Sequence, residues 1–167
     1  MYFPLHCHTH FSLLDGLSKP EQIADRVKSL GLSGAAITDH GNISGSVSFV
    51  KAMRKKGLKP ILGCELYICK ESASLRNKEN SKLNHLVVLA KNIDGWKQLI
   101  KITSESNKDE NFYRKPRLSL EQLSKFCDGN LVAFSGHLGS DLAEVVFGDK
   151  ASDAYNAESY EEAESLV

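Results

Sequence analysis

The sequence lacks the features that would place the protein in a membrane or on a secretory route. No apolar run approaches the ~20 residues that a transmembrane helix needs. The N-terminus has no basic start followed by an apolar stretch, which argues against a secretory signal. We therefore expect a cytoplasmic protein with no membrane partner.

Common nucleotide-binding and redox motifs are also missing. No G-x-G-x-x-G follows the first predicted strand and no G-x-x-x-x-G-K-[ST] occurs, so the usual dinucleotide and P-loop sites are not expected. Cysteine is scarce, and its four residues form no C-x-x-C pair, which argues against a zinc ribbon or a thioredoxin-like motif. We interpret all four as free thiols in a reducing cytoplasm.

An excess of either charge is absent as well, since Lys plus Arg and Asp plus Glu both number 21. No overall field then favours nucleic acid, so such a contact would be local or supplied by another domain. The 167 residues, 41% hydrophobic and 25% charged, are typical of one soluble globular domain.

Short apolar runs alternate with amphipathic segments along the chain. This alternation predicts an α/β protein with a parallel sheet of βα units, either open or closed as a barrel. The predicted strands are residues 2–8, 34–38, 59–68, 85–90 and 130–136. The predicted helices are 18–31, one ending at Gly57 with Val47, Val50 and Met53 inward, 94–106, 119–129, 141–148 and 159–167, whereas 69–84 reads as a polar surface loop.

Histidines and carboxylates recur where these strands end. In parallel βα folds such ends gather the functional side chains at one rim. The residues so placed are His6 and His8, Asp15 in the following loop, Asp39 and His40, Glu65, and His137. Imidazole and carboxylate ligands suit Zn²⁺, Mn²⁺ or Fe²⁺, and such clusters activate water against phosphoryl groups. The pattern therefore predicts metal-assisted hydrolysis of a phosphoester.

Several of these residues have simpler interpretations. His10 continues the spacing of His6 and His8, but the chain is expected to turn there, so His10 is interpreted as a bystander. Asp15 could be a turn residue of its Asp-Gly pair, and Asp39 could orient its neighbours rather than bind metal. His137 taken alone could be structural. His85 stands at the start of its strand, which places it at the opposite rim of a parallel sheet.

Six motifs together resemble a known family, namely the PHP (polymerase and histidinol phosphatase) domains at the N-terminus of bacterial DNA polymerase III alpha subunits. The motifs are HCHTHFSLLDG, ITDHGNISGSVSF, GLKPILGCELYI, HLVVLAKNIDGWKQLIKI, FYRKPRLSLEQL and DGNLVAFSGHLGSDLAEVV. The resemblance implies a distorted TIM-like (β/α)7 barrel with two or three divalent metal ions at one rim. It implies the metal ligands His6, His8, Asp15, His40, Glu65, His85 and His137. We expect His8, Asp15 and His40 also to be catalytic, and Asp39 to support the site without binding metal.

Two departures from the family qualify this expectation. Histidine stands at position 137, where cysteine is common in the polymerase branch. The family's last aspartate and histidine ligands, from an ND-x-H-like motif, are absent. We therefore expect residues 1–167 to be one PHP domain carrying about five βα units, either a piece of a longer chain or a naturally short relative.

The resemblance implies a phosphoesterase domain of a DNA polymerase, acting as a 3′→5′ exonuclease that proofreads. DNA would be reached through the full polymerase, and other replicase subunits are the expected partners. The alternative is an inactive structural module that docks such subunits. A third choice is a free-standing small-molecule phosphatase.

Overall fold

The computed structural model describes residues 2–136, 140 and 143. Its centre is a six-stranded sheet with the order β4-β5-β2-β3-β6, in which β1 also pairs with β2. β2 runs parallel to β1 and β5, whereas β3 runs antiparallel to β2 and β6. The strands are β1 (Gly34–Ile37), β2 (Lys59–Cys69), β3 (Leu83–Ala90), β4 (Phe112–Tyr113), β5 (Lys115–Ser119) and β6 (Leu131–Phe134).

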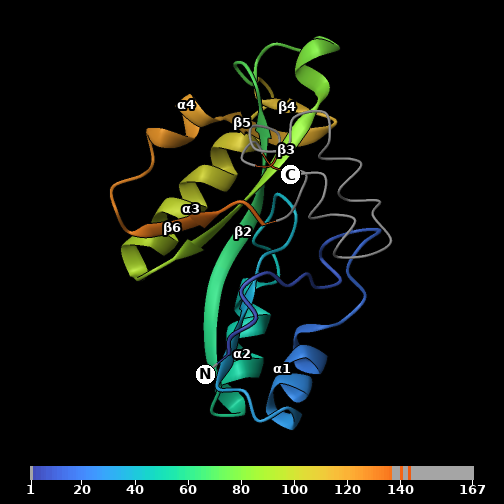
Figure 1. Ribbon diagram of the computed structural model, residues 1–167, viewed down its shortest axis with the longest axis vertical. Helices are drawn as coiled ribbons and strands as arrows, with labels where there is room; N and C mark the ends of the chain where they lie inside the picture. Colours follow the sequence, from blue (N-terminus) through green and yellow to red (C-terminus); the bar gives the residue numbers. More distant parts are fainter. Residues whose placement is uncertain (1, 137–139, 141–142, 144–167) are drawn as a thin grey trace, which may run out of the picture.

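Strand β2 is the spine of the molecule and connects its two halves (Figure 1). Residues 59–62 pair with β1, and residues 63–69 pair with β3. Near the first half lie α1 (Pro20–Ser29) and α2 (Ser46–Lys55), whose buried residues form one core with β1. Near the second half lie α3 (Ile93–Ser106) and α4 (Leu120–Ser124), which form a second core with β2, β3 and β5. A single 3-10 turn, Glu79–Ser81, precedes β3.

Alternation along β2 separates packing from chemistry. Cys64, Leu66 and Ile68 belong to the core that includes α3 residues. Because successive side chains of a strand point to opposite faces, Glu65 and Tyr67 face the other way. That second face of the sheet carries the candidate site.

The mixed α/β class is confirmed, but two details of the predicted sheet are wrong. Residues 2–8 form no strand; they run extended beside β1, where Pro4 and Cys7 accept hydrogen bonds from the backbone N–H of Ala36 and Thr38. The fully parallel arrangement is also wrong, because β3 begins at Leu83 and returns antiparallel along β2.

Two further predictions need correction. On α2, Met53 is buried as predicted, but Val47 is exposed and Phe49 is buried, so the stripe that faces the core is only partly the predicted one. Part of the 69–84 segment is buried rather than a free surface loop, since Ala73 and Asn80 pack inside. The predicted helix at 159–167, the ligand candidate His137, and all of the predicted helix at 141–148 except Ala143 lie outside the described residues.

Candidate metal centre

The candidate centre forms where three segments meet on the site face of the sheet. The extended N-terminal segment supplies His6 and His8. The chain after β1 stays beside β2, because Gly41 N–H donates to the Glu65 carbonyl and Glu65 N–H donates to the Asp39 carbonyl. His40 is thereby held next to Glu65, with which it forms a parallel bridge.

The antiparallel course of β3 resolves the position of His85. In the register of β2 and β3, His85 pairs with Tyr67 and Val87 pairs with Glu65. His85 therefore lies two residue pairs from Glu65 and on the same face, although it stands near the start of its strand. The expectation that His85 lies at the opposite rim is wrong, since it assumed a parallel strand.

Glu65 is the centre of the cluster, and its side chain is 1% exposed. Its Oε2 lies 2.9 Å from His6 Nε2, 2.9 Å from His8 Nε2 and 3.2 Å from His40 Nδ1. Its Oε1 lies 3.9 Å from His85 Nδ1. Four imidazoles from three separate segments thus surround one buried carboxylate.

These neighbours decide the charge of the carboxylate. Burial by itself favours the neutral form of Glu65, but the hydrogen bonds to His8 and His6, with His40 and His85 close by, lower its pKa to about 2. For His8, burial lowers the pKa, whereas the hydrogen bond to Glu65 and the charges of Glu65 and Asp15 raise it above its ordinary value. Without metal, the cluster therefore favours a carboxylate opposite a positively charged imidazole.

Asp15 extends the cluster toward solvent. Its Oδ2 lies 2.8 Å from His40 Nε2, and its side chain is 56% exposed. The loop that carries it is tightly packed, because a Cβ at Gly16 would lie 1.9 Å from the Thr9 carbonyl oxygen. Gly16 is thus needed for the close approach of this loop, which also brings Asp15 to His40.

Asp39 does not contact the cluster centre but holds the loop around it. The Asp39 carboxylate accepts hydrogen bonds from the Thr9 N–H at 2.7 Å, the Thr9 hydroxyl at 2.8 Å and the Ser12 hydroxyl at 2.7 Å. Because the Ser12 proton is given to Asp39, the Ser12 oxygen must accept from His8 Nδ1, 3.0 Å away. This chain of bonds places a proton on His8 Nδ1, so Nε2 is the nitrogen that donates to Glu65 in the metal-free protein and the one left to bind a metal ion.

The geometry yields three groups of ligand atoms, each with all atoms within 4.8 Å of one another. They are His6, His8 and Glu65; His8, Asp15 and His40; and His40, Glu65 and His85. Each pair of groups shares one residue, so the three groups form one connected cluster. Imidazole nitrogens and carboxylate oxygens are the donors that Zn²⁺, Mn²⁺ and Fe²⁺ accept, so the residues fit such ions.

The structure brings together six of the seven predicted ligands, and whether they bind metal stays a prediction. His10 belongs to none of the three groups and packs on the Phe11 ring with a centroid distance of 4.3 Å. Ser12 and Tyr67 were not predicted. Tyr67 lies two residues after Glu65 on the same face, so strand alternation could have indicated it; Ser12 had no comparable signal.

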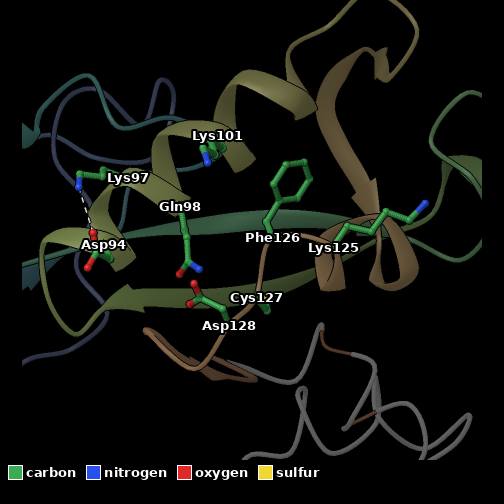
Figure 2. A pocket seen from close by; sticks show the side chains of 8 residues that line it. All are labelled: Asp94, Lys97, Gln98, Lys101, Lys125, Phe126, Cys127 and Asp128. Atoms are coloured by element: carbon green, nitrogen blue, oxygen red, sulfur yellow. Dashed lines mark hydrogen bonds and ion pairs between the residues drawn. The ribbon is translucent and has the colours of Figure 1, made fainter.

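A pocket of about 320 Å³ lies elsewhere, between α3 and the segment after α4. Figure 2 shows Gln98 opposite Asp128 and Lys97 paired with Asp94, with Phe126 and Lys125 further along. Its lining residues belong to none of the three ligand groups. In the described part of the chain, no helix is long and apolar enough to cross a membrane.

Comparison with known proteins identifies the family. The PHP domain model matches residues 4–167. The DNA polymerase III alpha subunit of Borreliella burgdorferi is 38% identical over 157 residues, which are 93% of this chain and 14% of that protein. That of Helicobacter pylori strain 26695 is 35% identical over 163 residues, 98% of this chain and 13% of that protein.

Two further similar proteins match a smaller share of this chain. The alpha subunit of Aquifex aeolicus is 39% identical over 141 residues, which are 80% of this chain and 12% of that protein. The chain thus spans about one seventh or less of these relatives. A Bifidobacterium adolescentis structure described as a metal-dependent phosphoesterase has a TM-score of 0.47 at 26% identity, over 62% of this chain and 32% of that one, which is too slight to support an argument.

Fold and site together define a mixed α/β protein whose histidines and carboxylates meet on one face of a central strand. With the family model covering residues 4–167, the chain belongs to the PHP domain family. The resemblance drawn from its motifs is confirmed.

Proposed function

We propose that the chain is the PHP domain of a cytoplasmic DNA polymerase III alpha-type replicase, and that its cluster is a metal-dependent phosphodiesterase. The activity would be 3′→5′ exonuclease cleavage that proofreads the polymerase's product. DNA would reach the site through the full polymerase, with other replicase subunits as partners. The similarity to polymerase alpha subunits supports this assignment, although the chain spans only a small part of them.

The observation that carries the proposal is the environment of Glu65. A carboxylate that is 1% exposed, with four imidazoles within 3.9 Å of its oxygens, is costly as a packing element. Two or three divalent ions, Zn²⁺, Mn²⁺ or Fe²⁺, would replace the imidazole protons as the positive partners. The proposed ligands are His6, His8, Asp15, His40, Glu65 and His85, with His137 as the seventh.

Each residue has a distinct part in the proposed reaction. Divalent ions bound at such a site lower the pKa of water and neutralise the phosphoryl oxygens. Glu65 supplies a permanent negative charge at the base, because its pKa is about 2. Ser12 and Asp39 hold His8 with Nε2 inward. The hydrogen-bonded Asp15 and His40 form the solvent-facing edge, where a substrate phosphate would arrive.

A second candidate is a metal that serves structure alone. The N-terminal segment is joined to β1 by few backbone hydrogen bonds, and the cluster ties His6 and His8 of this segment to β2. Metal there would fasten the segment to the sheet without catalysis, as in a docking module.

The experiment uses purified protein loaded with Mn²⁺ or Zn²⁺ and single-stranded DNA labelled at the 5′ end. We expect stepwise shortening from the 3′ end, lost in Glu65→Gln and Asp15→Asn while circular dichroism stays unchanged. Asp25→Asn, an exposed aspartate on α1, is the matched control and should retain activity. Wild type that cleaves no DNA, with variants that only lower the Tm, would favour the structural candidate; cleavage of small phosphomonoesters alone would favour a phosphatase.

A further inference from the structure

A basic hairpin stands beside the metal cluster without contributing to it. Strands β4 and β5 pair Tyr113 with Lys115, so the chain reverses over the single residue Arg114. Arg114 has φ of 62°, in the left-handed region that is costly for a residue with a Cβ. Arg114 and Lys115 are both exposed. A strained turn thus presents two permanent positive charges.

The hairpin is fixed against the loop that carries His40. A Cβ at Gly41 would lie 2.7 Å from Pro116 Cγ and 3.2 Å from Tyr67 Cε2, so Pro116 and Tyr67 both pack closely on the residue after His40. The Gly41 φ of 60° independently favours glycine at this position. The place of the hairpin relative to the cluster is therefore set by direct packing.

Tyr67 connects the hairpin with the imidazoles. Lys115 Nζ lies 4.3 Å from the centroid of the Tyr67 ring. The same ring stacks on His40 at 5.8 Å and lies 5.2 Å from His85. One aromatic ring thus stands between the lysine and the cluster, so Lys115 is near the candidate metals but outside their ligand set.

We propose that Lys115 and Arg114 bind the backbone phosphates that flank the cleaved bond of single-stranded DNA, and so select a polynucleotide over a small phosphate ester. This inference rests on the proposed function, because it takes the cluster as the place of cleavage. In a DNA strand, a phosphate at the cluster would have neighbouring phosphates one nucleotide away on either side. Lys115 lies on the Tyr67 ring, which itself contacts His40 and His85 of the cluster. Lysine and arginine at such positions add affinity without reading sequence.

The test measures DNA binding separately from cleavage. Fluorescence anisotropy with a labelled single-stranded oligonucleotide, in EDTA, is followed over a salt series for wild type, Lys115→Gln and Arg114→Asn. Removing one phosphate contact should weaken binding roughly fivefold and reduce the slope of log K against log salt by about 0.7. The control is Lys125→Gln, an exposed lysine of the distant pocket shown in Figure 2, which should leave both values unchanged.

Two further measurements distinguish DNA binding by the hairpin from a purely structural role, and the results that follow are those expected for DNA binding. Asparagine tolerates the left-handed conformation better than arginine, so Arg114→Asn should raise the Tm while it weakens binding. With Mn²⁺, Lys115→Gln should raise KM for the oligonucleotide and leave hydrolysis of a small phosphodiester unchanged. Equal binding by Lys115→Gln and Lys125→Gln, or no binding by wild type, would overturn the inference. If wild type cleaves no DNA but Lys115→Gln and Arg114→Asn still bind the oligonucleotide more weakly than wild type, the result counts against the proposed function alone.

Discussion

Two ionic side chains, Glu65 and Arg117, are buried on the same face of the central sheet, with exposed fractions of 1% and 0%. They lie on the paired strands β2 and β5, where Arg117 is in register with Tyr67, two residues from Glu65. Their surroundings are opposite in kind. The Arg117 guanidinium donates to the carbonyls of Asn80 at 2.7 Å, Ala73 at 2.9 Å and Leu75 at 2.8 Å.

The difference shows how a buried charge can serve structure or chemistry. Arginine remains charged at any working pH, and its partners are neutral carbonyls of a single loop, so this arrangement has one state. Glu65 faces imidazoles, which gain and lose protons near neutral pH and which metals can claim. Arg117 fixes a loop, whereas the charge of Glu65 is opposed by imidazoles whose protonation can change.

The largest effect on stability should come from removing the charge of Arg117. Arg117→Met removes the guanidinium donors to three carbonyls, although the Leu75 carbonyl keeps a hydrogen bond from Asn80 Nδ2. We expect a loss of about 3–5 kcal/mol in the free energy of unfolding. Urea denaturation measures it, with exposed Arg54→Met on α2 as the control. Lysine cannot reproduce the forked donor geometry, so Arg117→Lys should recover little of this loss. A cost below about 1 kcal/mol for Arg117→Met would contradict a structural role for the guanidinium.

Substitution of Glu65 should change the response of the protein to metal more than it changes the stability of the metal-free fold. A metal present at 100 times its Kd stabilises the protein by about 2.7 kcal/mol. We expect Zn²⁺ or Mn²⁺ to raise the wild-type Tm, and Glu65→Gln to abolish that rise while its metal-free Tm falls less than that of Arg117→Met. Thermal denaturation with and without EDTA measures both quantities. The exposed Glu21→Gln should respond to metal as wild type does; an unchanged metal response in Glu65→Gln would exclude Glu65 as a ligand.

The pH dependence separates the two charges further in metal-free protein. The folded pKa of Glu65, about 2, is below its ordinary 4.5, so its stabilisation is present above pH 4.5 and is lost as pH falls toward 2. The pKa of His8 is raised above 6.5, so its stabilisation is full below 6.5 and is lost as pH rises through the folded pKa. The difference in unfolding free energy between wild type and Glu65→Gln should therefore peak between pH 4.5 and 6.5. For Arg117→Met the corresponding difference should be nearly flat with pH.

The two charges also differ in what the sequence could reveal. Glu65 was predicted because histidines and carboxylates recur at the ends of apolar runs, and short spacings such as His6-x-His8 report a shared face directly. The rim of His85 was misplaced because strand direction depends on pairing between distant residues, which local pattern does not encode. Arg117 was missed altogether, since FYRKPR is a charged run that reads as a loop. Only the packing of residues 73–80 over β5 makes its last arginine internal.

The smallest effect we expect comes from Ser12, whose hydroxyl oxygen accepts hydrogen bonds from His8 Nδ1 and from the His40 N–H but contributes no atom to the three ligand groups. Ser12→Ala removes the acceptor for His8 Nδ1 and one donor to Asp39, so His8 is free to adopt the tautomer with its proton on Nε2. Metal affinity should fall about tenfold, the lower end of what such supporting groups contribute. Isothermal titration calorimetry measures it, with exposed Ser104→Ala on α3 as the control. Because Glu65 and the imidazoles remain, the metal should still raise the Tm, which distinguishes Ser12→Ala from Glu65→Gln. An unchanged affinity would show that the proton of His8 is placed without Ser12, and that Glu65 and the imidazoles hold the metal without help from this hydroxyl.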